Sequence, residues 1–285
     1  AAGARAHGFV PIAPSVDSNA EAVALSFNPT NFGYFATGNS TLSQVDRIDY
    51  SNDTADASPR GNLEHDAEEA SGVSSPLFGY VAGGHRDTES RIQRIEYAND
   101  TATSAPKGFL NVARNDMGPF GNTNFGYFAG GNYSSNYLTQ VSIVSRMDYS
   151  NDTVRVVEKG PLNAARYRFG GSGNQNFGYA SGGLQPVTAA VDKIDYANDT
   201  VQASPKGNLN TARRSVASTG NANFGYVCGG HDGSNVHSIV DRIEYANDTA
   251  TASPKGNLSH FADKCGAAGN QDFGYVGGGY NPSIP

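Results

Sequence analysis

The chain has 285 residues, and its 27 acidic and 20 basic side chains give a formal net charge of −7. This acidic balance argues against a nucleic-acid partner, and no run of about 18 apolar residues is present that could insert into a membrane. Two cysteines cannot form a disulfide framework, and 35 Gly, 15 Tyr and 14 Phe with only two Met favour short strands and tight turns over a helical bundle.

The N-terminal region precedes the first repeat unit, which begins near residue 22. A start at Ala1 rather than Met predicts a processed or truncated chain, and residues 1–7 lack the apolar run of a signal peptide. Residues 9–14 (Phe-Val-Pro-Ile-Ala-Pro) stand where an outer strand would precede the first unit. We therefore expect residues 1–15 to act as a closing segment.

Six internal repeats follow, each marked by the tripeptide Phe-Gly-Tyr. The tripeptides are separated by 46, 47, 52, 47 and 49 residues and start at Phe32, Phe78, Phe125, Phe177, Phe224 and Phe273. Small residues follow each tripeptide, ending in Gly-Gly from the second unit onward. A glycine within the strand should let a ring or backbone come close, and the Gly-Gly pair should allow positive φ.

Further along each unit come an Arg-Ile-Asp-Tyr block, an Asn-Asp-Thr turn and a Pro-containing segment, as in residues 193–209. Alternating side chains predict a strand for the block, and proline predicts an outer edge strand for the last segment. Each unit thus reads as four short strands, which we number from first to fourth.

Units of this kind bury both faces when they are arranged in a ring. The sequence therefore predicts an all-β, six-bladed kelch-like β-propeller with four-stranded blades, forming a single domain over residues 1–285 and closed by the N-terminal segment. The sixth unit has sequence for its first two strands only. Its third strand is supplied poorly by residues 1–7, is missing, or comes from a neighbouring chain.

Several repeated features have a structural explanation. The Arg-Ile-Asp-Tyr blocks predict a charge ladder with Arg114, Arg166 and Arg213, because a single active site would need asymmetry. The recurring Asn-Asp-Thr sequons are explained by turn chemistry without glycosylation. The histidines show no metal-ligand spacing, Cys228 and Cys265 are expected to be small buried residues, and no catalytic motif occurs. We expect no catalytic residue, no metal site and no cofactor.

The loops between the second and third strands differ from unit to unit, whereas the strands are near-copies. Rigid copies that carry unlike loops are typical of a scaffold that presents a binding surface, although neutral loop drift explains them equally well. The candidate binding residues lie in three of these loops: Asn132, Tyr133, Asn136 and Tyr137; His85 and Asp87; and His231, Asp232 and Asn235.

The wording of the repeat resembles kelch-like repeats in structural proteins of marine tailed phages, especially cyanophages. The similarity covers residues 22–279 and rests on Arg-Ile-Asp-Tyr-Ser/Ala-Asn-Asp-Thr followed by Asn-Phe-Gly-Tyr and Gly-Gly. Kelch blades usually carry a Trp, which this chain lacks. The resemblance implies a virion component located at the particle surface or outside the cell: a tail fibre, a tail-tip adhesin or a capsid-surface knob.

The function predicted from these observations is a non-enzymatic binding protein in a multimeric assembly, whose partners are other virion proteins and a host surface glycan or receptor. One alternative is a carbohydrate-active propeller enzyme of the oxidase, lyase or mutarotase type, which needs ionisable groups converging at one end of the central channel. The other is a pure assembly piece that docks through a blade edge.

Overall fold

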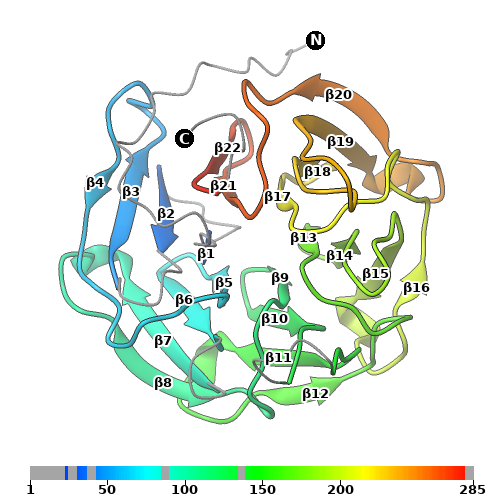
Figure 1. Ribbon diagram of the computed structural model, residues 1–285. Coiled ribbons are helices and arrows are strands. Elements are labelled where there is room, and N and C mark those ends of the chain that lie inside the picture. Colours follow the sequence, from blue (N-terminus) through cyan, green and yellow to red (C-terminus); the bar gives the residue numbers. More distant parts are fainter. Residues whose placement is uncertain (1–22, 25–30, 37–42, 85–89, 134–138, 280–285) are drawn as a thin grey trace.

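The computed structural model describes residues 23–24, 31–36, 43–84, 90–133 and 139–279. These residues form antiparallel sheets arranged around a central axis like the blades of a propeller (Figure 1). The predicted all-β propeller is therefore confirmed. None of the helices in this part of the chain has the length and apolar character needed to cross a membrane.

Five blades have four strands each, and within each blade the strands follow sequence order from the axis to the rim. Blade 1 contains β1 (Val23–Ala24), β2 (Phe32–Ala36), β3 (Val45–Asp49) and β4 (Ser58–Pro59). Blade 2 contains β5 (Ser71–Ser74), β6 (Phe78–Ala82), β7 (Arg91–Glu96) and β8 (Ala105–Phe109). Blade 3 contains β9 (Gly118–Gly121), β10 (Phe125–Ala129), β11 (Val144–Asp148) and β12 (Val157–Lys159). Blade 4 contains β13 (Gly170–Gly173), β14 (Phe177–Ser181), β15 (Val191–Asp195) and β16 (Ser204–Pro205). Blade 5 contains β17 (Ala217–Gly220), β18 (Phe224–Cys228), β19 (Ile239–Glu244) and β20 (Ser253–Asn257).

The prediction of six four-stranded blades is wrong. The sixth repeat contributes only the two-stranded sheet of β21 (Gly266–Gly269) and β22 (Gly274–Gly277), because the chain has no sixth copy of the third and fourth strands after it. The predicted closing segment, residues 1–15, lies outside the described residues, and no described strand pairs with the outer edge of β22. The ring is closed instead where β21 packs against β1 and β2, so closure by an N-terminal strand is corrected as well.

One strand register recurs in the five complete blades and explains the Phe-Gly-Tyr tripeptide. In blade 1, Gly33 pairs with Ile48, and Tyr34 pairs with Arg47. A Cβ on Gly33 would lie 2.6 Å from the hydroxyl oxygen of Tyr50, so only glycine leaves room for that ring. The expected close approach is thus confirmed. The Gly-Gly pair behaves as expected too: Gly83 and Gly84 have φ of 70° and 139°.

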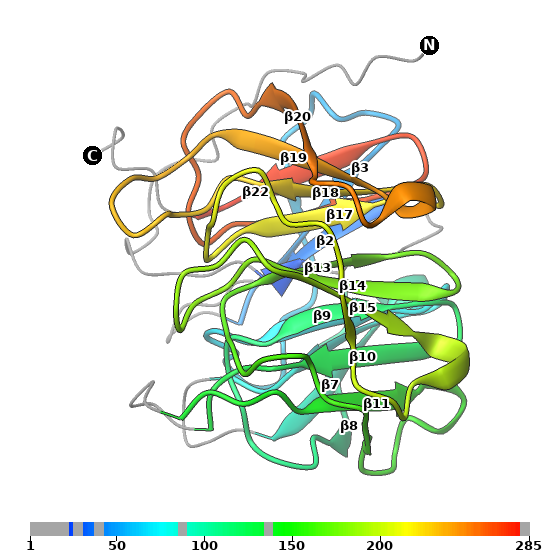
Figure 2. The same ribbon diagram turned by 90° about the vertical axis from the view of Figure 1, so that its right-hand side faces the viewer.

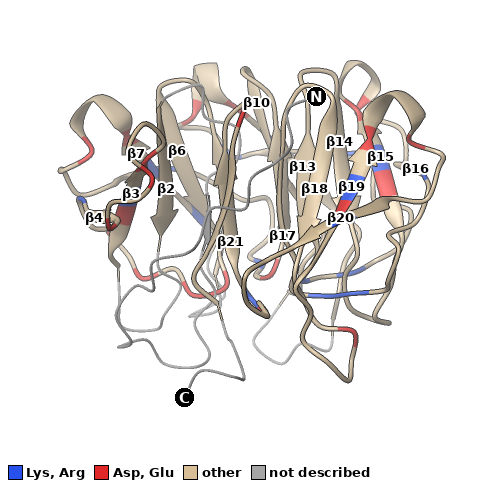
Figure 3. Cartoon of the chain, turned by 90° about the horizontal axis from the view of Figure 1, so that it is seen from above, with Lys and Arg blue, Asp and Glu red and all other residues tan. Residues whose placement is uncertain are grey.

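Short 3₁₀ helices connect the third strand to the fourth strand in four blades: η2 (Tyr97–Asn99), η3 (Tyr149–Asn151), η4 (Tyr196–Asn198) and η5 (Tyr245–Asn247). They contain the Asn of the predicted Asn-Asp-Thr turns, and they lie on one face of the ring, opposite the loops between the second and third strands (Figures 2 and 3). We call the two sides the turn face and the loop face.

The apolar core lies between neighbouring blades. The tyrosine that begins each 3₁₀ turn stacks on the Phe-Gly-Tyr tyrosine of the preceding blade; for example, the rings of Tyr196 and Tyr127 have centroids 4.8 Å apart. Tyr127 is fully buried and packs in one cluster with Leu162 and Ile194. Burying side chains of this size contributes roughly 1.5–3 kcal/mol each, so the blades hold one another in place.

A buried aspartate completes each contact between two full blades. Asp199, which follows the 3₁₀ turn of blade 4, accepts a hydrogen bond from the Tyr127 hydroxyl of blade 3 at 2.9 Å. It also pairs with Arg146 and Lys159 of blade 3 at 2.8 and 3.1 Å. We call the Asp of each Asn-Asp-Thr a junction aspartate: Asp53, Asp100, Asp152, Asp199 and Asp248.

The predicted charge ladder is structural, as expected, but its pairing is confirmed only in part: two of its three arginines meet a carboxylate of the third strand, and that carboxylate precedes the Arg-Ile-Asp-Tyr block. Arg166 and Arg213 are buried and pair within their own blades, with Asp192 at 2.9 Å and with Asp241 at 2.7 Å. Arg114 binds the Ser145 hydroxyl at 2.6 Å, and burial lowers its pKa to about 10, which leaves it charged at neutral pH. In blades 1 to 3 the arginine of the repeated block, Arg47, Arg94 or Arg146, instead reaches the junction aspartate of the next blade, a contact that one blade alone cannot make.

Candidate functional site

The loop face carries the residues that differ most between repeats. In blades 3, 4 and 5, the loop between the second and third strands begins beside the loop that leads into the innermost strand of the same blade. Three β-bridges join them: Asn115 with Asn132, Tyr167 with Leu184, and Arg214 with His231. The two sets of loops therefore form one surface around the axis.

Five residues at the entrance of the central channel form a ring, which we call the mouth ring. Each member lies two residues before the first residue of an innermost strand and has a positive φ of 52–59°. The members are Glu69, Asp116, Arg168, Ser215 and Lys264. From the second member onward, each backbone N–H donates to the carbonyl of the preceding member, with four N···O distances of 2.9, 3.0, 2.6 and 3.2 Å along the series. Non-glycine residues rarely adopt this conformation, and such positions gather at functional sites.

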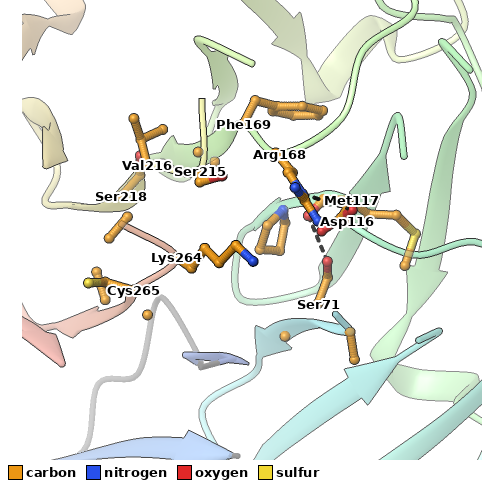
Figure 4. Close-up of a pocket in the computed structure, with 18 residues that line it drawn as sticks. Ser71, Asp116, Met117, Arg168, Phe169, Ser215, Val216, Ser218, Lys264 and Cys265 are labelled. Atoms are coloured by element: carbon orange, nitrogen blue, oxygen red, sulfur yellow. Dashed lines mark hydrogen bonds and ion pairs between the residues drawn. The ribbon is translucent and has the colours of Figure 1, made fainter. Parts of the chain in front are cut away.

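The mouth ring opens into a cavity of about 100 Å³ on the axis (Figure 4). Four ring members line it together with Gly, Ala and Ser residues of the innermost strands, whose small side chains leave the axis unfilled. In Figure 4, Lys264 and Arg168 reach into the cavity from different sides. The channel entrance is thus a polar recess that a small group could enter.

Charge is divided unevenly around the mouth ring. Arg168 pairs with Asp116 at 3.1 Å and with Glu69 at 3.0 Å, so one cation holds two carboxylates. Across the cavity, Lys264 makes no side-chain hydrogen bond or ion pair with any described residue. Its neighbour Asp263 is buried, and burial raises the pKa of that carboxyl. An anionic group in the cavity would therefore find its counter-ion in Lys264.

The structure places two of the predicted residues of the third loop. Asn132 is completely buried, and its amide nitrogen and oxygen have no hydrogen-bond partner among the described residues. Tyr133 is exposed at the surface of the same loop. The other predicted residues of this loop and of the second unit's loop lie outside the described residues: Asn136, Tyr137, His85 and Asp87.

The predicted residues of the fifth loop bond mainly to one another. Asp232 accepts hydrogen bonds from the backbone N–H groups of Asn235 and Ser234, both at 2.7 Å, and contacts His237 at 2.8 Å. These bonds hold the pKa of Asp232 well below its ordinary value. The Gly233 N–H donates to His231 at 2.8 Å. Hydrogen bonds within the loop therefore hold its conformation, and the Asp232 carboxylate is already occupied by partners in the same turn.

The sequence analysis missed the mouth ring, although a signal for it exists. Its members stand nine residues before the Phe of each following Phe-Gly-Tyr, and they change from Glu to Asp, Arg, Ser and Lys while the flanking strands stay alike. The position is not part of a known motif. Only the ring geometry shows that residues about 48 apart in sequence meet at one entrance.

Among the described residues, no group of three or more His, Cys, Asp or Glu side chains is arranged to hold a metal ion. Cys228 and Cys265 are free thiols in one core cluster; Cys228 is buried, as expected, and Cys265 is partly exposed. Burial raises the pKa of the Cys228 thiol to about 12, so it stays protonated at neutral pH.

No protein-family model matches the chain, and no curated protein matches it. Solved structures do match. One, described as "Structure of YjhT", has a TM-score of 0.76 at 10% sequence identity, over 96% of this chain and 93% of that one. At this identity the likeness concerns the fold alone, and it leaves the kelch and phage resemblance a prediction. By its fold, the chain is a β-propeller along nearly its whole length.

Proposed function

We propose that the protein is a non-enzymatic binding module that recognises a polar, anionic ligand on its loop face, around the mouth ring. The observation that carries the proposal is that the residues that differ between repeats lie together on one surface, the loop face with its mouth ring. The strands and the turn face repeat one pattern, whereas the five members of the mouth ring are five different residue types: two acids, two bases and one neutral serine. A scaffold that only needed to close a ring would have no use for this difference.

Lys264 supplies the ligand chemistry. It faces the cavity without a carboxylate partner among the described residues, while Arg168 is already paired with two acids. A carboxylate or another anionic group on a sugar or peptide would fit beside Lys264, and the exposed Tyr133 ring would add contact area at low entropic cost. The phage-like wording of the repeat supports a setting at a virion surface, in a tail fibre, adhesin or capsid knob, with a host glycan or another virion protein as partner.

A second candidate function is a carbohydrate-active propeller enzyme. It is favoured by the convergence of ionisable groups at one end of the channel, including the buried Asp263 with its raised pKa. Against it, Glu69 and Asp116 are held by Arg168, so these carboxylates are engaged in ion pairs and poorly placed for proton transfer. Binding without turnover therefore fits the geometry better.

An array of acidic and neutral glycans tests the proposal. We expect the full chain to bind acidic glycans, and we expect Lys264→Ala and Tyr133→Ala to weaken binding at least about tenfold. Thr200→Ala, an exposed change on the turn face, is the matched control and should leave binding unchanged. Binding that survives the Lys264 change, or that is lost in the Thr200 control, contradicts the proposed site. Conversion of a bound glycan would favour the enzyme.

A further inference from the structure

The two-stranded sheet of the sixth repeat has an open outer edge in the described part of the chain. β22 is hydrogen-bonded to β21 on one side and to no described strand on the other (Figure 1). Phe273, at the start of this last repeat, is 51% exposed, whereas a cation covers the equivalent Phe of all five complete blades, at 4.1 Å for Arg94 over Phe78. Among the described residues, the outer edge of β22 therefore has no paired strand and the Phe273 ring has no cation over it, unlike the corresponding strands and rings of the complete blades.

Blade 5 carries every type of side chain that holds a junction aspartate in the other blades, but no aspartate of the described residues meets them. Between blades 4 and 5, Asp248 binds Tyr179, Lys193 and Lys206 at 2.9, 2.8 and 3.2 Å. The equivalent residues of blade 5 are Tyr226, Arg242 and Lys255. None of these three pairs with a carboxylate of the described residues, and the buried Nε of Arg242 has no hydrogen-bond partner.

The backbone gives independent evidence at the rim. Gly207 donates its N–H to the Asp248 carbonyl at 2.8 Å, and a Cβ there would lie 1.9 Å from the Ala250 carbonyl oxygen. Three other glycines at this position are equally crowded by the next blade, whereas a Cβ on Gly256 of blade 5 would meet nothing within 4 Å. In the other blades this glycine is needed because a neighbouring turn comes close. Blade 5 has the same glycine, but no turn of the described residues approaches it.

Blade 1 shows the other half of the same interface. Its junction aspartate, Asp53, is exposed, and among the described residues its side chain binds only the Tyr275 hydroxyl, at 2.9 Å, while the four others are buried between a tyrosine and two cations. The rings of Tyr50 and Tyr275 stack with centroids 5.0 Å apart. The two-stranded sheet of the sixth repeat is therefore seated against blade 1 as the other repeats are seated against their neighbours, but no cation of the described residues pairs with Asp53.

We propose that this open edge binds a β-hairpin of a partner polypeptide that has the chemistry of the third and fourth strands of this repeat. The hairpin would pair with β22, and its tyrosine would stack on Tyr226. Its junction aspartate would meet Arg242 and Lys255, and its own cations would cover Phe273 and reach Asp53. Strand addition of this kind gains affinity from backbone hydrogen bonds and specificity from the side-chain pockets. The charges at the two flanks differ, so the hairpin can enter in one orientation only.

A synthetic peptide with the sequence of residues 191–209 is the direct probe, because it contains one complete hairpin of this type. With the full chain we expect saturable binding by fluorescence anisotropy and a higher Tm of the complex. The same peptide carrying Asp199→Asn should bind at least about tenfold more weakly, because its amide cannot pair with the two cations.

Variants of the full chain test the position of the site. Gly256→Ala should leave the Tm of the free protein unchanged or slightly raised, since its Cβ would meet nothing, and should abolish peptide binding. Arg242→Gln should weaken binding, whereas Arg155→Gln, an exposed cation of blade 3, is the charge-matched control and should not.

Three outcomes would overturn the proposal. One is the absence of peptide binding. Another is binding that Gly256→Ala leaves intact. The third is a concentration-dependent dimer that the peptide dissociates, which would assign the edge to a second copy of this chain.

Discussion

The interface between blades 4 and 5 and the interface between blade 5 and the two-stranded sheet of the sixth repeat are built from the same residues on the side of the preceding blade, but they differ on the other side. Blades 4 and 5 present the same tyrosine, cations and glycine to the next unit, yet only blade 4 receives a 3₁₀ turn and its aspartate in return. As a result Tyr179 is fully buried, whereas Tyr226 remains half-buried. One repeat therefore supplies half of an interface. Its tyrosine, cations and glycine stabilise the fold only when the neighbouring repeat supplies the 3₁₀ turn and the aspartate.

Removing a junction aspartate should give the largest contrast between the two kinds of interface. Asp199→Asn leaves Arg146 and Lys159 without their carboxylate in a buried site, so we expect the free energy of unfolding to fall by about 3–5 kcal/mol. Asp53→Asn, an exposed position at the open interface, should cost less than about 1 kcal/mol. Urea denaturation followed by circular dichroism measures both, and equal losses would contradict the comparison.

Adding one methyl group should give the next largest contrast. Gly207→Ala forces a Cβ against the Ala250 carbonyl oxygen, and we expect a loss of about 1–3 kcal/mol. Gly256→Ala in the free chain should be neutral or slightly stabilising, because alanine restricts the unfolded chain and meets no neighbour. Thermal melts of the two variants measure the difference. A loss at Gly256 as large as at Gly207 would show that an element outside the described residues already covers the edge.

Acid should weaken the complete interfaces by a smaller amount. Burial opposes ionisation of Asp248, but hydrogen bonds from Lys193, Tyr179 and Lys206 still hold its pKa below the ordinary value. A carboxyl with a lowered pKa in the folded state stabilises the protein above its unfolded pKa and loses this contribution as the pH falls through the folded value. The free energy of unfolding should therefore fall less steeply below about pH 5 in Asp248→Asn than in the parent chain.

Urea midpoints measured between pH 6 and pH 2.5 give the two slopes. Thr249→Ala, an exposed change next to the same aspartate, is the control and should keep the parental slope. Identical slopes in Asp248→Asn and the parent would show that the Asp248 carboxylate does not contribute to the loss of stability in acid.

Repeat spacing and residue type were sufficient to predict the propeller, the mid-strand glycine and the Gly-Gly turn, since each recurs with the repeated strand pattern and with residue types that have a marked backbone preference. The number of complete blades was not predicted correctly, because six tripeptides were counted although only five copies of the outer strands follow them. Of the predicted loop residues, Asp232 proved to be engaged within its own turn, which only coordinates can reveal.

By itself, the sequence determined the repeating unit: alternating strands, turns rich in Asn and Asp, and glycines where a ring must fit. Tertiary structure decided which charges meet, since Arg146 finds Asp199 in the next blade and not the acid two residues away in its own strand. It also decided that Glu69, Asp116, Arg168, Ser215 and Lys264 share one channel entrance. The physical reason is that local pattern fixes backbone geometry within about ten residues, whereas ion pairs and cavities depend on closing a ring of units about 48 residues apart.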